Sequence, residues 1–357
     1  MKQRVFVTGA TGGMGFASLK EMLKYSEKQD IAILARDSEK NRNILKSYTE
    51  TPGLEIVWGD LNNYDDVLKC VKGCDLIFHI AAFVSPVADY YPKQAMKVNY
   101  GSTRNIINAI YEFGQQERTR LVYIGTVAET GDRMPPVHWG RVGDPIKPSM
   151  FDYYAVSKVA AERLVIESGL KYWVSLRQMG IIGRAMAEIE DAIMFHNCFD
   201  NVLEYCSDRD SARSMKNLCA FFHDGTLEES FWGHIYNIGG GAPCRISTYE
   251  MYRIIYGAIG MTNLDYMLSP KKEATLNFHG QYYLDSDKLE NYLHLRHDSM
   301  QYFYDCYLEK LGALCNVSKI LCRLPGGQRL MGSILLRRFD KLARTEHGTL
   351  HFIEDNA

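Results

Sequence analysis

The first half of the chain alternates short apolar runs with longer stretches in which apolar residues recur at helical spacing. The short runs are rich in Val, Ile, Leu and Phe without strict alternation, which is typical of strands buried on both faces. We expect strands at Arg4–Val7, Ile31–Ala35, Leu54–Trp58, Asp75–Ile80, Leu121–Gly125 and Trp173–Arg177. We expect helices at Met14–Ser26, Tyr64–Val71, Tyr100–Phe113 and Phe151–Glu167. This alternation predicts an α/β fold, a doubly wound parallel sheet covered by helices.

Beyond about residue 180 the pattern loses its regularity, and short strand-like and helix-like segments mix. We expect three parts: a nucleotide-binding domain over residues 1–180, to which later segments return, a smaller substrate lobe over 181–305, and a helical tail over 306–357. Pro325-Gly326-Gly327 is expected to break the tail.

Bulk composition narrows the function classes. Of 357 residues, 46% are hydrophobic and 24% are charged, which is ordinary for a globular protein. The net charge of −2 gives no basic field, so we expect no nucleic-acid partner. The nine cysteines form no Cys-x-x-Cys pair, so we expect reduced structural thiols and no metal site. No secretory segment precedes the first strand and no run of about 18 apolar residues occurs, so a cytoplasmic protein is expected.

A glycine-rich turn follows the first expected strand. Val5-Phe6-Val7 runs into Thr8-Gly9-Ala10-Thr11-Gly12-Gly13-Met14-Gly15, after which a helix begins. Glycine lets the backbone curl tightly and approach a pyrophosphate, while the helix amino terminus offers free N–H groups to the anion. Placement between a strand and a helix predicts a Rossmann-type dinucleotide site. We expect the cofactor to contact Gly9, Thr11, Gly12, Gly13, Met14 and Gly15.

The residue expected to read the cofactor's ribose is Arg36, at the end of the second strand and 36 − 15 = 21 positions after Gly15. A carboxylate there would accept hydrogen bonds from the ribose hydroxyls of NAD, whereas a guanidinium pairs with the 2′-phosphate of NADP. Asp37 follows directly and could still turn inward. We therefore favour NADP as the cofactor, with NAD as the alternative.

The candidate chemistry lies in Tyr154-Ala155-Val156-Ser157-Lys158, where spacing of four on a helix places Tyr154 and Lys158 on one face. A nearby ammonium lowers the pKa of a phenol by favouring phenolate, so Tyr154 is the expected acid–base group. Lys158 can also reach the nicotinamide ribose. Thr126 ends the fifth strand, at the sheet edge where ligands bind, and can hydrogen-bond the substrate oxygen.

These motifs resemble the extended short-chain dehydrogenase/reductase superfamily, and within it the NAD-dependent epimerase/dehydratase family. Besides the glycine turn, Thr126 and the Tyr154/Lys158 pair, the similar stretches are Asp60-Leu61, His79-Ile80-Ala81-Ala82 and Asn99-Tyr100-Gly101-Ser102-Thr103-Arg104-Asn105. The resemblance implies Asp60 and Leu61 beside the adenine, the backbone of Ala81 and Ala82 along the cofactor, and Asn99 as a further catalytic residue. It also implies a homodimer, formed by the helices that carry Asn99–Phe113 and Tyr154–Glu167. Gln178 stands where the family's Leu-Arg-Pro strand has proline, which puts the pocket details in doubt.

Several residues near the expected mouth of the site are candidates for substrate contact. They are Phe83, Ser85, Tyr153, Gln178 and Phe195, with Trp139 as a further aromatic candidate. The stretch from Leu34 to Lys40 resembles dihydroflavonol-reductase-like members, which use NADPH. We therefore expect an NADP-dependent reductase or dehydrogenase that acts on a carbonyl, alcohol or enone of a small, fairly apolar molecule.

Three alternatives stay open. A nucleotide-sugar epimerase would keep NAD bound, and Arg36 argues against it. A nucleotide-sugar dehydratase resembling this family would carry Asp-Glu after the catalytic threonine, where this chain has Val127-Ala128. A non-catalytic NADP-binding sensor resembling this fold would usually lack the Tyr154/Lys158 pair.

The tail carries Arg and Lys residues among apolar ones. Such a segment is either an interfacial membrane helix or a packing helix with a solvated basic face, and we favour the packing helix. The basic residues are Arg323, Arg329, Arg337, Arg338, Lys341 and Arg344, and the apolar ones are Ile334, Leu335, Leu336, Phe339 and Leu342.

Overall fold

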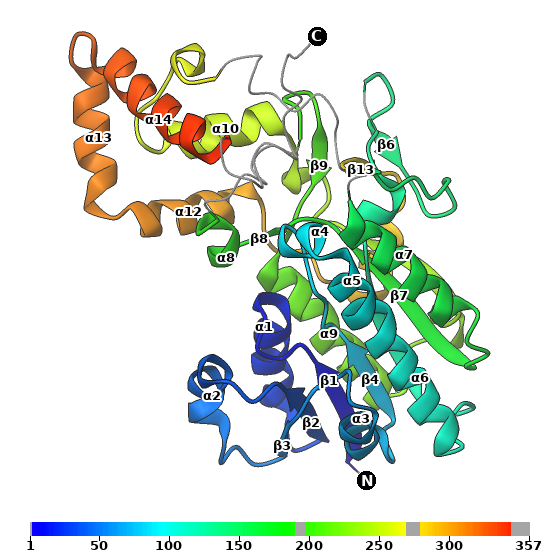
Figure 1. The fold of residues 1–357 in the computed structure, drawn as a ribbon. Helices are drawn as coiled ribbons and strands as arrows, with labels where there is room; N and C mark the ends of the chain where they lie inside the picture. The colour runs from blue at the N-terminus through cyan, green and yellow to red at the C-terminus, as the bar shows by residue number, and fades with distance from the viewer. Residues whose placement is uncertain (1, 134, 151, 190–196, 269–278, 344–357) are drawn as a thin grey trace.

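The centre of the protein is a seven-stranded parallel sheet in the order β11-β7-β5-β4-β1-β2-β3 (Figure 1). It is seen in a computed structural model that describes residues 2–133, 135–150, 152–189, 197–268 and 279–343. The strands are β1 (Gln3–Thr8), β2 (Gln29–Ala35), β3 (Leu54–Trp58), β4 (Leu76–His79), β5 (Arg120–Thr126), β7 (Tyr172–Gln178) and β11 (His234–Ile238). The expected doubly wound α/β fold is confirmed.

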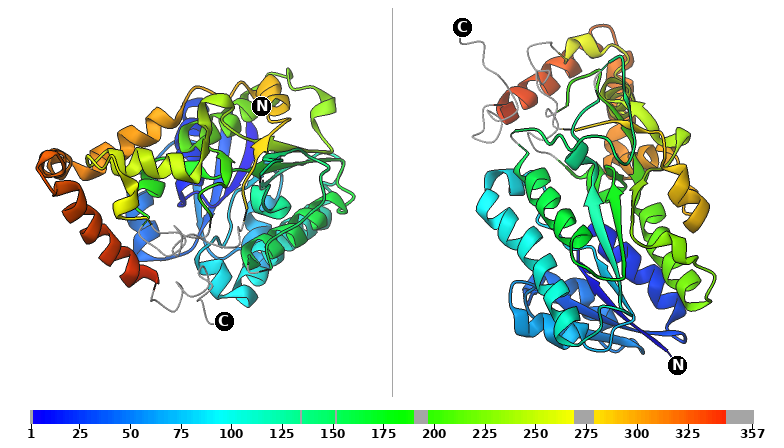
Figure 2. Two further views of the ribbon diagram at one scale, coloured as in Figure 1. Left: turned by 90° about the horizontal axis from the view of Figure 1, so that it is seen from above. Right: turned by 90° about the vertical axis from the view of Figure 1, so that its right-hand side faces the viewer.

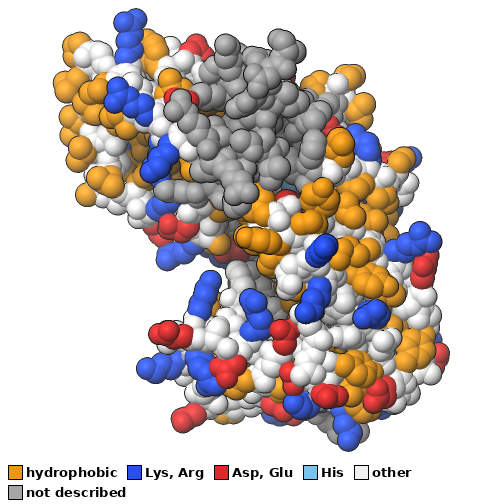
Figure 3. Space-filling view, viewed as in Figure 1, with side chains coloured by type: hydrophobic (Ala, Val, Ile, Leu, Met, Phe, Trp, Pro, Cys, Tyr) orange, Lys and Arg blue, Asp and Glu red, His pale blue; other side chains and the backbone are white. Residues whose placement is uncertain are grey.

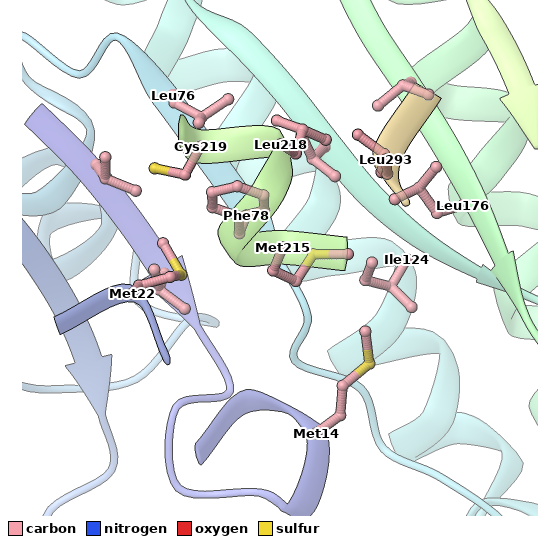
Figure 4. Close-up of a cluster of buried hydrophobic side chains, with 14 of the residues drawn as sticks. Met14, Met22, Leu76, Phe78, Ile124, Leu176, Met215, Leu218, Cys219 and Leu293 are labelled. Atoms are coloured by element: carbon pink, nitrogen blue, oxygen red, sulfur yellow. The ribbon is translucent and has the colours of Figure 1, made fainter. Parts of the chain in front are cut away.

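Each face of the sheet has its own hydrophobic core because successive side chains of a buried strand point to opposite faces. Val5 and Val7 belong to one core and Phe6 to the other. The first core lies against α1 (Gly13–Met22), α9 (Asp208–His223) and α11 (Asp287–Leu293), and Figure 4 shows Met14, Met215 and Leu218 within it. The second core lies against α3 (Tyr64–Val71), α6 (Gly101–Glu112) and α7 (Tyr153–Ile166).

The sheet has a switch point between β1 and β4, where the chain winds outward in opposite directions. Ligands of open α/β sheets bind outside the carboxyl ends of the strands at such a point. The loops that follow the two strands approach closely there: a Cβ on Gly9 would lie 2.8 Å from the amide nitrogen of Ala81. The fold therefore places the glycine turn and the Ala81 loop at one site.

The second half of the chain contributes both to the Rossmann layers and to a smaller lobe. Helix α9 packs against α1, and β11 adds an edge strand to the main sheet. The smaller lobe contains three short strand pairs, β8 (Ile181–Ile182) with β10 (Cys206–Ser207), β9 (Val202–Glu204) with β12 (Arg245–Ser247), and β6 (Trp139–Gly140) with β13 (Tyr282–Tyr283). The division near residue 180 stays a proposal.

Figure 2 shows the fold from two further sides, with the remaining helices around the sheet and in the tail. They are α2 (Glu39–Leu45), α4 (Val87–Tyr90), α5 (Pro92–Ala95), α8 (Arg184–Ala187), α10 (Thr248–Gly257), α12 (Met300–Leu311), α13 (Ala313–Arg323) and α14 (Gly327–Ala343). The expected helical tail and its break between α13 and α14 are seen in the described part. A π-helical segment, Met96–Tyr100, joins α5 to α6, so this helix begins earlier than expected.

All nine cysteines are free and buried, as expected for reduced structural thiols. None of the described helices is both long enough and apolar enough to cross a bilayer.

Candidate active site

The glycine turn forms a cradle that only glycine fits. Gly9 has φ +71°, and a Cβ on Gly15 would lie 2.1 Å from the carbonyl oxygen of Gly9. The turn closes with a hydrogen bond of 2.9 Å from the N–H of Gly12 to the same oxygen. Gly12 is the N-cap of α1 and gives that helix no side-chain cap. The first turn of α1 is therefore suited to an anion such as a pyrophosphate.

The other residues expected at the glycine turn differ in how far they are exposed to solvent. Thr11 is half-buried, and Gly13 lies in the open with Ala185 of α8 as its nearest neighbour across the turn. Met14 points into the hydrophobic core, so only its backbone is available to a cofactor.

Arg36 lies exposed just after β2, where the ribose-reading residue was expected. Among the described residues, no side-chain hydrogen bond or ion pair engages its guanidinium. The neighbouring Asp37 is occupied instead: Arg42 donates to both of its carboxylate oxygens, at 2.6 and 2.7 Å. Arg36 is therefore available to an anionic group, whereas Asp37 is neutralised by Arg42.

The residues expected beside the adenine and along the cofactor lie at the same edge of the sheet. The exposed carboxylate of Asp60 caps its own turn by accepting the N–H of Asn62 at 2.8 Å. Leu61 is held through its carbonyl, which accepts from Asn105 at 2.8 Å. The N–H of Ala81 donates to the hydroxyl of Thr8 at 3.0 Å, and Ala82 follows in the same half-buried loop.

Thr126, Tyr154 and Lys158 come together where β5 ends against α7. Thr126 is the last residue of β5, and its hydroxyl lies beside the phenol of Tyr154, where it favours the ionised phenol. It also accepts the N–H of Ala128 at 3.3 Å. Tyr154 and Lys158 lie one helical turn apart on α7, and Lys158 is almost completely buried. The expected triad is thus one cluster at the carboxyl edge of the sheet.

The electrostatics of this cluster correct one expectation. Burial raises the pKa of the Tyr154 phenol, and the hydrogen bond with Thr126 offsets only part of the rise. Burial lowers the pKa of Lys158 to about 8. Its Nζ donates to the carbonyl of Ile124 at 2.6 Å and lies 4.1 Å from the ring centroid of Tyr123. The expected lowering of the phenol pKa by Lys158 is therefore wrong here, and Tyr154 is protonated at neutral pH.

A buried ionic cluster lies behind the triad, and the sequence analysis missed it. Arg177 contacts Glu162 at 2.6 Å and Glu129 at 3.4 Å. Oε1 of Glu129 accepts the N–H of Thr126 at 3.0 Å, which completes a capping box. Burial raises the pKa of Glu129 well above its usual value. Burial opposes ionisation of Glu162 too, but hydrogen bonds from Arg177 hold its pKa below the usual value. Burial therefore favours the protonated form of Glu129 and Arg177 favours the ionised form of Glu162.

Two acidic side chains fix the first turn of α7, and these were also missed. The N–H of Tyr154 donates to Asp89 at 3.0 Å, and the N–H of Ala155 donates to the N-cap residue Asp152 at 2.7 Å. Burial, with the Asp152 charge nearby, raises the pKa of Asp89 to about 6. Carboxylates at a helix amino terminus complement its partial positive charge, so they stabilise the turn that carries Tyr154.

Asn99, expected to be catalytic, is hydrogen-bonded to two neighbouring segments. Its Oδ1 accepts the N–H of Phe83 at 2.7 Å, and its Nδ2 donates to the carbonyl of Phe83 at 3.0 Å and to Ser157 at 2.8 Å. These bonds tie the loop after β4 to α7. The catalytic role of Asn99 stays a prediction.

The residues expected to contact the substrate have different surroundings: some side chains are engaged by neighbours and others are exposed. Gln178 ends β7 directly beside Thr126 in the sheet, but its side chain is engaged with Ser211 at 3.1 Å. Ser85 lies beside Asp89, whose pKa it lowers, and Tyr153 is exposed at the start of α7. Trp139 lies in β6 against the ring of Tyr282. Phe195 lies outside the described residues.

Known proteins were compared with the whole chain. It is 30% identical over 209 residues to a 3-beta-hydroxysteroid dehydrogenase from Mycolicibacterium neoaurum, a match that covers 56% of this chain and 52% of that protein. It is 31% identical over 109 residues to a UDP-glucose 4-epimerase from Rickettsia akari, which covers 29% of this chain and 32% of that protein. The chain thus spans about half the length of the first relative and less of the second.

Structural similarity extends further along the chain than sequence similarity. A dTDP-glucose 4,6-dehydratase from Streptomyces venezuelae, solved with NAD bound, matches with a TM-score of 0.67. That match covers 87% of this chain and 98% of the other at 19% identity, so it shows a shared fold. The sequence profile of the NAD dependent epimerase/dehydratase family matches residues 5–205, more than half of the chain. The resemblance read from the motifs is therefore confirmed, and the chain belongs to the NAD dependent epimerase/dehydratase family.

Proposed function

We propose that the protein is an NAD(P)-dependent oxidoreductase that interconverts a carbonyl and an alcohol on a small, fairly apolar molecule. One observation carries the proposal: the Tyr154 phenol and the Thr126 hydroxyl lie beside each other at the carboxyl edge of β5, close enough for the hydroxyl to lower the pKa of the phenol. That edge also holds the uncapped amino terminus of α1 and its glycine cradle. A nicotinamide dinucleotide fits this cradle, because the turn excludes every side chain at Gly9 and Gly15.

The residues of the triad divide the chemistry among them. When bound, the nicotinamide supplies or accepts the hydride. Tyr154 holds its proton at neutral pH and donates it to the substrate oxygen as negative charge develops there. Thr126 hydrogen-bonds the same oxygen, so that the oxygen faces two fixed hydroxyl groups. Lys158 uses one N–H on the carbonyl of Ile124 and keeps two for the cofactor's ribose hydroxyls.

The surroundings of Thr126 favour an apolar alcohol or ketone over a nucleotide sugar. Val127 and Ala128 follow Thr126, so the chain lacks the Asp-Glu pair that dehydration would require there. The relative with the longer sequence match is named as a 3-beta-hydroxysteroid dehydrogenase. We therefore propose hydroxysteroids and similarly apolar secondary alcohols, with their ketones, as the substrate class.

We propose NADP as the preferred cofactor. The exposed guanidinium of Arg36 carries the proposal, since it is available to a 2′-phosphate while Asp37 is held by Arg42. The related structure with bound NAD keeps NAD as the alternative.

We also propose a cytoplasmic homodimer in which α6 and α7 pair with their counterparts. Helices α6 and α7 lie side by side (Figure 1), and both expose apolar side chains. They include Tyr111, Val156 and Ile166, which are between 40% and 45% exposed. Such a surface suits a contact between copies.

The test is a turnover assay with matched substrate panels. Purified protein is incubated with NADPH or NADH and apolar ketones, and in parallel with nucleotide sugars and NAD. We expect absorbance loss at the nicotinamide band with the ketones and no epimerised sugar. Epimerised sugar without net nicotinamide oxidation would support the epimerase instead, and cofactor binding without turnover on any panel would support a sensor.

A further inference from the structure

The tail forms an arm, α13 with α14, that packs by one side only. Its inner side chains Cys322 and Phe339 join a small core with residues of α10, which includes Tyr252 and Tyr256. The arm lies at the end of the molecule opposite the N-terminus (Figure 1). The expected packing helix is therefore present. Packing explains the apolar side chains on the inner side of the arm, but not those on its outer side.

The outer side of α13 exposes a stripe of large apolar side chains. Leu314, Val317, Ile320 and Leu324 recur at spacings of three and four, which places them on one helix face. Leu330 and Ile334 continue the apolar surface on α14. These six side chains are between 51% and 69% exposed, although each would be buried in an ordinary core. We name this surface the arm stripe.

Cations flank the arm stripe. Residues 313–343 carry six Lys or Arg and one Asp, so their net charge is 6 − 1 = +5, whereas the whole chain carries −2. Arg323, Arg337 and Lys341 are exposed and form no ion pair within the described part of the chain. Figure 3 shows hydrophobic and basic side chains side by side over this end of the molecule.

We propose that the arm stripe docks on an anionic lipid surface. An interfacial helix buries an apolar face at the headgroup boundary while Lys and Arg beside it meet anionic headgroups, and the arm presents both. Long basic side chains can lay their stems along apolar surface and keep their charge among the headgroups. The described helices do not cross a membrane, so the association is peripheral and reversible.

The net positive charge of the arm argues against a second copy of the chain as the partner that covers the arm stripe. A two-fold contact places the same patch on both partners, so a net charge of +5 would meet its equal. An anionic bilayer offers the complementary sign across the whole stripe, and it takes up exposed Leu, Ile and Val without requiring a shaped groove.

The experiment is co-sedimentation of the full chain with vesicles of phosphatidylcholine alone or phosphatidylcholine with phosphatidylglycerol. We expect association with the anionic vesicles only, and release at about 1 M salt, where the Debye length falls to about 3 Å. Val317→Glu with Ile320→Glu should weaken association at least ~10-fold, because it removes apolar area and adds repulsion. Arg323→Glu with Arg337→Glu should do the same through charge alone.

Matched variants separate docking from damage. Leu284→Glu alters a side chain that is 62% exposed, like Ile320, but lies outside the arm, and Lys72→Glu reverses an exposed charge at the C-cap of α3. Both should bind the anionic vesicles as the wild type does, and all variants should keep the thermal midpoint and cofactor affinity. Absence of association, or equal association by arm and control variants, would overturn the proposal. A lower oligomeric mass in the arm variants would assign the stripe to a self-contact and would also overturn it.

Discussion

The proton on Glu129 can be tested by replacing the side chain with its neutral isostere. In the wild type, the N–H of Thr126 donates to Oε1 of Glu129 at 3.0 Å, and in Glu129→Gln the amide oxygen can accept the same bond. The amide N–H of the glutamine can donate to Glu162 in place of the carboxyl proton. A shape-conserving neutral replacement should therefore cost less than about 1 kcal/mol of the free energy of unfolding. If Glu129 were ionised, the variant would instead break a buried ion pair with Arg177 and lose about 3–5 kcal/mol.

The pH dependence of the free energy of unfolding tests the same proton more sharply. A carboxyl whose pKa is raised in the folded state contributes stability below its unfolded pKa and loses it as pH rises toward the folded pKa. Between the unfolded pKa of a glutamate, about 4.3, and the raised folded pKa of Glu129, the unfolded group has lost its proton and the folded one keeps it, so wild-type stability falls by about 1.4 kcal/mol per pH unit from this group. Glu162, whose pKa is lowered in the folded state, is ionised in both states across this window. The Gln variant should lack that fall, and other titrating groups cancel in the difference.

Urea unfolding followed by tryptophan fluorescence, at several pH values, measures both quantities. Glu129→Ala is the matched control: it removes the same proton, so it should share the flatter profile, but it leaves the N–H of Thr126 without its acceptor and removes one of the two carboxyl groups beside Arg177. It should therefore lose about 1–3 kcal/mol at every pH. Parallel profiles for wild type and Glu129→Gln would refute the protonated carboxyl.

Three further outcomes follow from the site and its surfaces. NADPH should bind at least ~10-fold tighter than NADH, about 1.4 kcal/mol, and Arg36→Ala should erase that gap while leaving NADH affinity unchanged in fluorescence titrations. Gly15→Ala should abolish binding of both cofactors, because its Cβ would lie 2.1 Å from the oxygen of Gly9, while Gly257→Ala, with open space around it, should bind them normally. Light scattering at micromolar concentration should give a dimer mass, and a monomer mass alone would reject the α6–α7 contact.

The sheet could be predicted from sequence because its strands are continuous apolar runs with no competing interpretation. Strand β3 and helix α3 have the expected bounds, and the others differ by one or two residues at most ends. β11 was missed because its strand, His234–Ile238, is short and lies in a region of mixed pattern. Only its pairing with β7 in space shows that it completes the sheet.

The candidate active site also has parts that could be predicted from the sequence and parts that could not. The glycine turn and the Tyr154/Lys158 pair are local in sequence, so their spacing alone indicates them. The buried cluster of Glu129, Glu162 and Arg177 is long-range, although Glu129 lies three residues after Thr126 and Glu162 one helical turn after Lys158, which is the signal that could have found it. The sign of the Tyr154 pKa shift could not be predicted, because burial is its largest cause and burial is a property of the folded chain.

The most direct test of the oxidoreductase account is single-turnover reduction of an active ketone by NADPH with wild type and Tyr154→Phe. The phenylalanine keeps the ring on α7 and removes only the hydroxyl beside Thr126. We expect the rate to fall by about 10²–10⁴-fold, the usual contribution of a positioned acid–base group, with NADPH affinity nearly unchanged. A near-wild-type rate for Tyr154→Phe would contradict the proposed proton donor.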